Sequence, residues 1–219
     1  FQDYALFPHL TVLGNVTFGL KSVTQRQRFP AHKRKTEAER AIALVGLAGF
    51  ENRYPHELSG VQQQRVALAR ALAPRPSLVL LDDPFSNLDV QVRLYLRQEV
   101  RDILKGVGAS GVFVTHAQEE AMSISDRLAV MRQGQIEQLD TPERVYHQPA
   151  SQFVAEFVTQ ANFLPTKQVG SRWDTVLGSF PVRPEDASLT EGQMMIRQED
   201  LHLQADEQGP LIVRDRQFH

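Results

Sequence analysis

The stretch LSGVQQQR at residues 58–65 constrains this chain more than any other part of its sequence. Ser59 and Gly60 stand where a loop turns into a helix that residues 66–73 continue. A helix start leaves backbone N–H groups unpaired and carries a partial positive charge, so it favours an anion. We therefore expect a phosphate group there, although capping of the helix by Ser59 explains the same residues without a ligand.

An apolar strand follows this helix. Residues 78–81 (LVLL) form a short continuous apolar run, which predicts a parallel strand buried on both faces. Asp82 and Asp83 come directly after it. Because ligands of open α/β sheets bind beyond the carboxyl ends of the strands, these two carboxylates mark a second candidate site.

Further segments follow in a fixed order. The sequence PFSNLD continues from the two carboxylates, and a later apolar strand, VFV at residues 112–114, ends in Thr115 and His116. With these residues in this order, the chain resembles the nucleotide-binding subunit of ABC transporters. The matching motifs are a Q-loop at residues 1–3, the signature at 58–62, the Walker B strand at 78–83, the D-loop at 86–89 and the switch histidine His116.

Composition excludes several other classes. The formal net charge is −2 and the basic residues are dispersed, apart from a cluster at residues 32–35 that we expect in a solvated loop. We therefore expect no nucleic-acid partner. The chain has no cysteine, which rules out a disulfide framework. No stretch approaches the roughly 18 apolar residues of a membrane span, so a membrane would be reached through a partner.

The first residues of the chain indicate where the phosphate-binding loop of the family lies. Phe1 and Gln2 read as the end of a strand already in progress, and the phosphate-binding pattern G-x-x-x-x-G-K-[ST] does not occur in the sequence. The resemblance implies that this loop lies upstream. We therefore expect an N-terminally truncated cassette that begins at the Q-loop and is inactive on its own.

The resemblance also predicts the fold and the domains. We expect an α/β chain: a partial P-loop NTPase (ABC ATPase) domain at residues 1–160, with a helical subdomain at about 3–75, and then a small all-β OB-like accessory domain at 161–219. Within the first domain, residues 22–35 are predicted to form a mobile connection. A helix is then predicted to begin at Thr36, whose spacing to Glu39 matches a capping box.

Short strand-like runs dominate the last part of the chain. A hairpin is predicted from residues 128–131 and 136–139, and a helix is predicted to open at Thr141 and Pro142. Beyond residue 161, Gly and Pro separate further runs at 162–169, 173–177, 194–197, 201–203 and 211–213. Residues 197–200 (RQED) stand near the arginine-proline-glutamate-aspartate turn that recurs in such accessory domains. We expect the barrel to be incomplete.

The resemblance assigns roles around ATP and Mg²⁺. It implies that Asp82 holds Mg²⁺, that Gln2 contacts both Mg²⁺ and the attacking water, and that Asp83 is the catalytic base. It also implies that His116 bonds the γ-phosphate.

The signature residues would act on a second copy of the subunit. Ser59, Gly60 and Gln62 would contact the ATP that this copy holds, with Gly60 allowing close approach because it has no side chain. Asp89 would lie at the interface between the two copies, besides capping the helix that follows it.

Two residues depart from the family pattern. Val61 replaces the second glycine of the signature, which puts closure over ATP in doubt. Asp83 replaces the usual glutamate, and its carboxylate is set back by roughly 1 Å, a displacement that can cost about 100-fold in rate. We expect slow turnover as one consequence.

The function predicted from these motifs is the ATP-hydrolysing subunit of an ABC importer, most like the ferric iron group. Polyamine, sulfate or sugar import are alternatives. The predicted partners are a second copy of the subunit, membrane permease subunits and, indirectly, a solute-binding protein. The predicted location is the cytoplasmic face of the inner membrane, as a peripheral protein. A catalytically degraded regulatory module and a non-transport ABC ATPase are the alternatives of another class.

Overall fold

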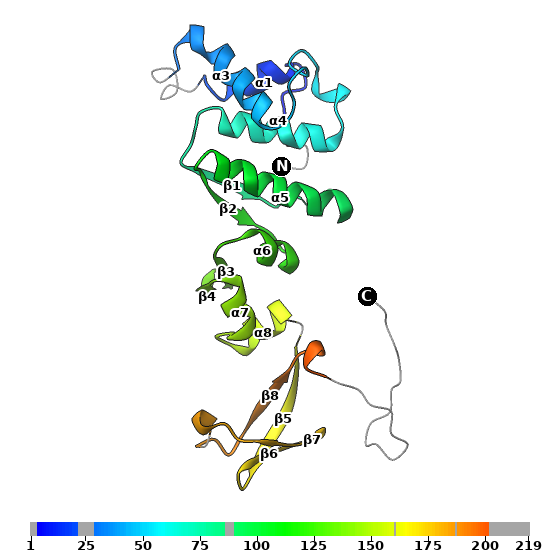
Figure 1. Ribbon diagram of the computed structural model, residues 1–219, viewed down its shortest axis with the longest axis vertical. Coiled ribbons are helices and arrows are strands. Elements are labelled where there is room, and N and C mark those ends of the chain that lie inside the picture. Colours follow the sequence, from blue (N-terminus) through cyan, green and yellow to red (C-terminus); the bar gives the residue numbers. More distant parts are fainter. Residues whose placement is uncertain (1–3, 22–28, 86–89, 160, 187, 202–219) are drawn as a thin grey trace. The chain divides into compact units, whose positions relative to one another are not determined.

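The computed structural model describes residues 4–21, 29–85, 90–159, 161–186 and 188–201 (Figure 1). Gln2 and the predicted D-loop with Asp89 lie outside the described residues. The chain divides into two compact units, Phe1–Ser125 and Asp126–His219, which we call the first and second unit. The predicted domain boundary near residue 160 stays a prediction. Among the described helices, none has the length and apolar character needed to cross a bilayer.

The first unit combines helices with one pair of parallel strands. Its elements are α1 (Val12–Phe18), α3 (Ala31–Leu44), η1 (Pro55–Glu57), α4 (Gly60–Leu72), β1 (Leu78–Asp82), α5 (Val90–Gly106), β2 (Ser110–Val114) and α6 (Gln118–Ile124). Strands β1 and β2 pair in parallel, with Leu78 opposite Ser110 and Asp82 opposite Val114. The predicted α/β class and the parallel strands are therefore confirmed.

Helices α1, α3 and α4 form a helical layer around one part of the core (Figure 1). Val12 and Val16 of α1, Ile42 of α3, and Val66 and Ala69 of α4 are fully buried there. Burying a large aliphatic side chain stabilises a fold by about 1.5 to 3 kcal/mol, so these contacts fix the position at which α4 starts.

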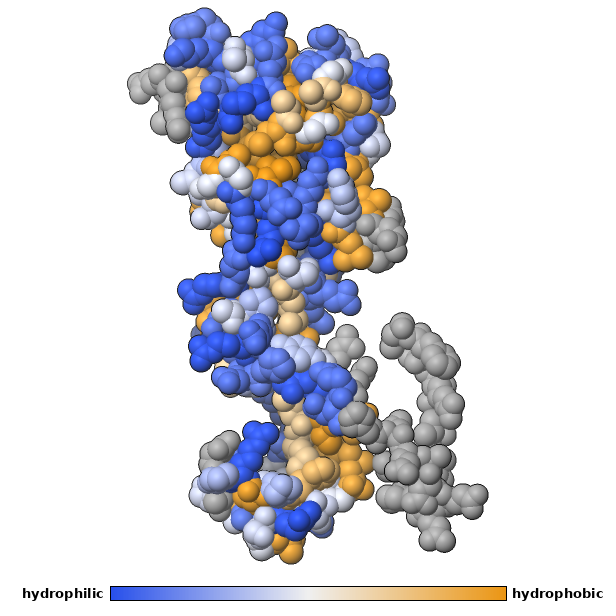
Figure 2. All heavy atoms as spheres, viewed as in Figure 1, coloured by the Kyte–Doolittle hydropathy of each residue, from blue (hydrophilic) through white to orange (hydrophobic). Residues whose placement is uncertain are grey.

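The strand β1 is buried on only one face of the described structure. Val79 is 6% exposed, whereas Leu80 is 74% exposed. Val112 and Val114 of β2 are also exposed. The prediction of burial on both faces is therefore wrong for the described residues, because successive strand side chains point to opposite faces and only one face is covered. Figure 2 shows apolar residues at the surface of the first unit, between α4 and α5.

The helix α3 begins earlier than predicted. Pro30 is its N-cap residue and Thr36 lies inside the helix, so the predicted capping box and the solvated loop at residues 32–35 are both wrong. Proline at the N-cap provides an extended backbone that leads into the first turn. Phe29 is buried and its carbonyl oxygen accepts a hydrogen bond from Arg34 Nε at 2.9 Å. This anchor fixes the start of the helix ahead of Thr36.

The second unit begins with a hairpin and two helices. These elements are β3 (Leu128–Arg132), β4 (Gln135–Asp140), α7 (Pro142–His147) and α8 (Gln152–Thr159). Gln133 and Gly134 join the antiparallel strands with φ values of 49° and 79°, as a two-residue hairpin turn requires. Thr141 Oγ1 accepts a hydrogen bond from Arg144 N and caps α7. The predicted hairpin and helix start are confirmed.

A four-stranded antiparallel sheet follows. Its strands are β5 (Asn162–Val169), β6 (Arg172–Thr175), β7 (Gly178–Pro181) and β8 (Glu191–Ile196), in the order β7-β6-β5-β8, with short turns η2 (Pro184–Asp186) and η3 (Gln198–Asp200). The strand β7 was not predicted, because it is short, exposed and bounded by Gly and Pro. The predicted strand at 211–213 and most of that at 201–203 lie outside the described residues. An OB-like barrel at 161–219 stays a prediction.

The turn at residues 197–200 is tied to α7. Arg197 Nη2 donates a hydrogen bond to the Tyr146 carbonyl oxygen at 2.7 Å, and its guanidinium lies 5.0 Å from the centroid of the Tyr146 ring. The Tyr146 hydroxyl bonds the Glu199 carboxylate, which raises the pKa of Tyr146 and lowers the pKa of Glu199. The end of β8 is therefore fixed to the helix before the sheet.

Candidate functional site

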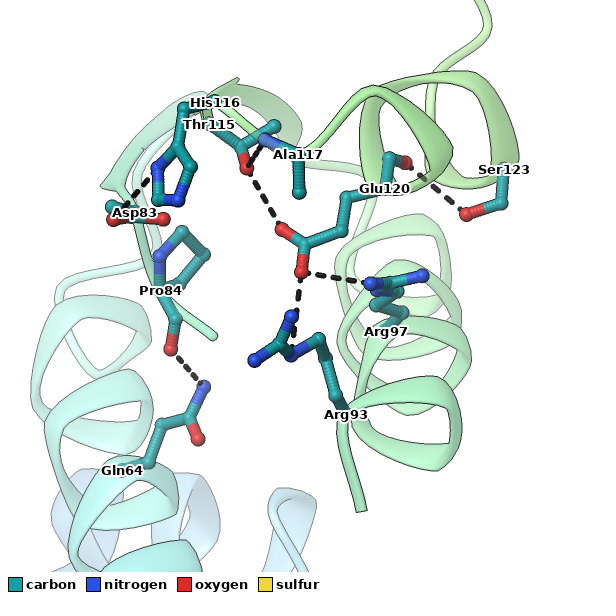
Figure 3. Close-up of polar contacts among 10 residues, drawn as sticks. All are labelled: Gln64, Asp83, Pro84, Arg93, Arg97, Thr115, His116, Ala117, Glu120 and Ser123. Atoms are coloured by element: carbon teal, nitrogen blue, oxygen red, sulfur yellow. Dashed lines mark hydrogen bonds and ion pairs between the residues drawn. The ribbon is translucent and has the colours of Figure 1, made fainter. Parts of the chain in front are cut away.

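The ends of the two parallel strands bring two predicted site residues together. Asp83 N donates a hydrogen bond to the Val114 carbonyl oxygen at 2.7 Å, which continues the β1–β2 pairing by one step. His116 follows two residues after Val114, and its Nδ1 lies 3.4 Å from Asp83 Oδ2 (Figure 3). Asp82 is exposed at the same strand end. The two acids and the histidine therefore gather where parallel strands present ligands.

Asp83 has an unusual backbone conformation. Its φ is 44°, in the left-handed region that Asp tolerates better than most residues but that still costs roughly 1 to 3 kcal/mol. Such strain clusters at functional sites, where the surrounding structure holds it in place. Here the hydrogen bond from Asp83 N to Val114 fixes the backbone, and the carboxylate faces His116.

The start of α4 forms a second group of predicted site residues. Ser59 Oγ accepts a hydrogen bond from Gln62 N at 3.3 Å, and Gln62 Oε1 accepts one from Ser59 N at 3.0 Å. This is a reciprocal capping box, so capping by Ser59 is confirmed. Both Ser59 and Gly60 are exposed. The partner role of Gln62 was missed, although the spacing S-x-x-Q signals it.

Gly60 and Val61 differ in what surrounds them. A Cβ built on Gly60 would meet no described atom within 4 Å, so the folding of the described residues does not require a glycine there. The Val61 side chain is partly buried against the hydrophobic core. Valine therefore fits the first turn of α4, and its predicted effect on closure over ATP stays untested.

A buried glutamine links the helix α4 to the strand end that carries Asp82 and Asp83. Gln64 is 8% exposed, and its Nε2 donates a hydrogen bond to the Pro84 carbonyl oxygen at 2.9 Å (Figure 3). Pro84 directly follows Asp83. The helix that begins at Gly60 is thus bonded to the strand end that carries the carboxylates. This contact was not predicted, since nothing local in the sequence links positions 64 and 84.

An arginine of the same helix holds the chain near the predicted Q-loop. Arg70 donates hydrogen bonds to the carbonyl oxygens of Ala5 at 2.6 Å and Tyr4 at 3.1 Å. Both of these residues have positive φ, 49° and 51°. Burial lowers the pKa of Arg70. The segment that follows Gln2 is therefore fastened to α4.

The buried side chain of Asn15 holds the segment that leads into α1. Asn15 is fully buried; its Oδ1 accepts a hydrogen bond from Phe7 N at 2.8 Å, and its Nδ2 donates to the carbonyl oxygens of Phe7, Leu10 and Thr11. One side chain therefore satisfies several backbone groups that would otherwise be buried without partners.

The oxygen donors at the strand end fit a magnesium ion. No group of three or more His, Cys, Asp or Glu side chains in the described ranges could hold a metal by itself. Mg²⁺ is usually bound by one or two carboxylates together with phosphate oxygens and water. The exposed carboxylate of Asp82, next to Asp83, is a donor set of that kind.

Comparison with known proteins places these residues in context. Residues 1–86 match the family profile described as ABC transporter. The chain is 48% identical over 202 residues to the sulfate/thiosulfate import ATP-binding protein of Chromobacterium violaceum. The alignment covers 92% of this chain and 54% of that protein.

Two relatives that are named for other substrates match to a similar degree. The spermidine/putrescine import ATP-binding protein of Pseudomonas fluorescens is 41% identical over 98% of this chain and 60% of its own length. The Fe(3+) ions import ATP-binding protein of Rhizobium etli is 48% identical over 78% of this chain and 47% of its own length. The chain thus spans about half of the length of the curated relatives it matches.

A solved structure agrees with these matches. A dimeric bacterial ABC transporter cassette superposes with a TM-score of 0.52 at 33% identity, covering 65% of this chain and 61% of that one. The same cassette in a post-hydrolysis state, bound to ADP and Pi, superposes with a TM-score of 0.50 at 31% identity, over the same fractions of both chains. The fold is therefore that of an ABC cassette, a P-loop NTPase. By sequence and by fold, this chain is similar to the ATPase domain of import-type ABC transporters.

Proposed function

We propose that the chain is part of the ATP-hydrolysing subunit of an ABC importer. The observation that carries this proposal is the position of His116 Nδ1 at 3.4 Å from Asp83 Oδ2, at the ends of two paired parallel strands. A base and a hydrogen-bonding imidazole at this edge fit a reaction in which water attacks a terminal phosphate.

Each residue at the strand end has a role in the proposed reaction. Asp82 would hold Mg²⁺, and the bound ion neutralises charge on the phosphate oxygens. Asp83 orients the attacking water and accepts its proton, while His116 donates a hydrogen bond to the γ-phosphate. Gln2 is proposed to contact the attacking water and the Mg²⁺, but this residue lies outside the described residues.

The signature residues are proposed to act on a second copy of the subunit. Ser59, Gly60 and Gln62 stand at an exposed helix start, where a positive partial charge favours phosphate. The open space at Gly60 supports close approach of a nucleotide from outside the chain. Asp89, which lies outside the described residues, is proposed to line the same interface. One similar solved cassette is itself described as dimeric.

The remaining partners follow from the importer assignment. We propose a homodimer that drives membrane permease subunits, with a solute-binding protein acting on the permease, and a peripheral position at the cytoplasmic face of the membrane. Ferric iron is one candidate cargo. Sulfate or thiosulfate and spermidine or putrescine are equally good candidates, because relatives that are named for those substrates match at similar identities.

ATP hydrolysis by the protein expressed from its complete reading frame tests the proposal. We expect Mg²⁺-dependent turnover that falls by at least about 100-fold in Asp83→Asn and in His116→Ala, since each removes a group placed at the reacting phosphate. Asp102→Asn changes an exposed acid on α5 and is the matched control. Equal turnover in wild type, Asp83→Asn and His116→Ala would refute the assignment.

The shorter side chain of Asp83 favours one alternative, a regulatory module with degraded catalysis. An Asp83→Glu variant decides between the two. Faster turnover in Asp83→Glu supports a slow but working ATPase, whereas no turnover in either wild type or Asp83→Glu supports the regulatory module. Uptake of labelled sulfate, polyamine or Fe³⁺ by cells that lack the protein, with and without its gene restored, identifies the cargo.

A further inference from the structure

The structure contains a buried charged cluster beside the His116 turn. Glu120 of α6 is 3% exposed, and its Oε1 accepts a hydrogen bond from Arg97 Nη2 at 2.7 Å. Arg93 Nε lies 3.5 Å from the same oxygen. Both arginines belong to α5, so the carboxylate joins α6 to α5 (Figure 3).

The second carboxylate oxygen of Glu120 reaches the turn itself. Glu120 Oε2 accepts a hydrogen bond from Thr115 Oγ1 at 2.8 Å, and Thr115 Oγ1 in turn accepts one from Ala117 N at 3.0 Å. Thr115 and Ala117 are the two neighbours of His116 along the chain. The chain on both sides of the histidine is therefore held by one buried carboxylate.

Packing does little to orient the His116 ring. Its side chain is 82% exposed, so few neighbouring atoms restrict its rotation. The backbone that carries it must then be fixed by other means, and the bonds of Thr115 and Ala117 provide this. A buried ion pair is expensive to desolvate and often adds no net stability over apolar residues. The effect of the Glu120 ion pair that matters here is therefore the fixed position of the His116 turn.

The same cluster includes residues from the N-terminal half of α5. The helix α5 begins at Val90, directly after the predicted D-loop at residues 86–89. Arg93 and Arg97 are the fourth and eighth residues of this helix. The carboxylate of Glu120 therefore links the His116 turn to the helix that follows this loop.

We propose that Glu120, held by Arg97, is a positioning residue for His116. It fixes the turn of Thr115, His116 and Ala117 against α5, which keeps the imidazole beside the Asp83 carboxylate. Glu120 itself is buried, so it would act through the turn that carries His116 and not on the reacting atoms. This inference rests on the proposed ATPase function, since positioning has a catalytic effect only if His116 acts on the γ-phosphate.

Two isosteric substitutions test the proposal in the protein from its complete reading frame. Glu120→Gln keeps the volume but removes the charge, and Thr115→Val keeps the shape but removes the hydroxyl. We expect kcat to fall by about 10- to 100-fold in both, with KM for ATP changed by less than about 3-fold, because small displacements of a catalytic group cost rate. Thr115→Ser, which retains the hydroxyl, restores most of the activity.

The matched control is Glu119→Gln, which removes a neighbouring carboxylate that is exposed on the same helix. We expect wild-type kcat in this variant. Thermal unfolding is measured for all variants. If Glu120→Gln does not fold, Thr115→Val decides, because it leaves the ion pair of Glu120 with Arg97 in place. Folded Glu120→Gln and Thr115→Val with wild-type kcat would overturn the proposal.

A second readout separates this inference from the proposed function. The NMR signals of the His116 ring, assigned by comparison with His116→Gln, are expected to shift in Glu120→Gln and Thr115→Val and to stay in place in Glu119→Gln. If the wild type hydrolyses no ATP, the proposed function fails while the ring signals still test the positioning. Unchanged ring signals in both folded variants would refute the positioning directly.

Discussion

Replacing Gly60 by alanine separates what folding needs from what a ligand needs at the start of α4. A Cβ at Gly60 would meet no described atom within 4 Å. Alanine is also favoured over glycine in a helix, and it restricts the unfolded chain. We therefore expect Gly60→Ala to leave the free energy of unfolding unchanged or to raise it by up to about 1 kcal/mol.

The same substitution is expected to impair the proposed closure over ATP. If a nucleotide held by a second copy approaches the backbone at Gly60, an added methyl group overfills the contact. Overpacking costs about 1 to 3 kcal/mol, which corresponds to a loss of roughly 5- to 150-fold in ATP-dependent dimerisation. Sedimentation of the Asp83→Asn protein with ATP, with and without Gly60→Ala, measures this loss.

Gly19→Ala is a control with the opposite expectation. Gly19 has a helical backbone, with φ −58° and ψ −23°, that alanine adopts without strain. Its Cβ, however, would lie 2.6 Å from the Arg70 carbonyl oxygen and 3.3 Å from Arg70 Cγ. Because α1 and α4 would have to move apart, we expect the free energy of unfolding to fall by about 1 to 3 kcal/mol.

Gly60→Ala and Gly19→Ala are compared in two measurements. Urea unfolding of both proteins gives the stabilities, and the dimerisation assay gives the effect at Gly60. A Gly60→Ala protein that is destabilised as much as Gly19→Ala would show that glycine serves the fold of this chain. A stable Gly60→Ala protein with wild-type ATP-dependent dimerisation would show that no nucleotide approaches this position.

Three further predictions concern the stability of each unit. Asn15→Ala leaves several buried backbone groups without their partner, so urea unfolding is expected to show a loss of about 2 to 4 kcal/mol; a loss below about 0.5 kcal/mol would contradict the contacts. Burial raises the pKa of Glu37, but hydrogen bonds led by the one from Arg75 outweigh it and lower this pKa below 4.5. The stability that Glu37 contributes is therefore complete above pH 4.5 and is lost as the pH falls through the lowered pKa. By thermal unfolding, Glu37→Gln should cost about 0.2 to 1 kcal/mol at pH 7, and this cost should shrink as the pH falls below 4.5. Arg197→Ala removes the hydrogen bond and the stacking at Tyr146, so we expect faster proteolysis near residues 197–200 and unchanged cleavage in the first unit. If wild type and Arg197→Ala are cleaved at the same rate near residues 197–200, the contact with Tyr146 does not hold this turn.

The sequence by itself determined the elements whose signals are local. The apolar runs that became β1 and β2, the cap at Ser59, the hairpin turn at Gln133 and the start of α7 at Thr141 each depend on a few adjacent residues. Capping, turn chemistry and burial of an apolar run act over short stretches, so they can be predicted without knowing the fold.

Local signals failed where a distant contact decided the outcome. The capping spacing at Thr36 was outweighed by the anchored start at Phe29 and Pro30. Leu80 belongs to an apolar run, yet which of its two faces is covered depends on the elements that pack beside the strand. The bond between Gln64 and Pro84 spans 20 residues and leaves no local pattern.

Glu119 and Glu120 give the clearest contrast between the two levels. They are identical residues, adjacent in the sequence, and nothing local distinguishes them. In the folded chain Glu119 is exposed, whereas Glu120 is buried against two arginines of α5 and bonded to the His116 turn. Successive helical residues point about 100° apart, so only the packing of α6 on α5 decided which carboxylate is desolvated and paired.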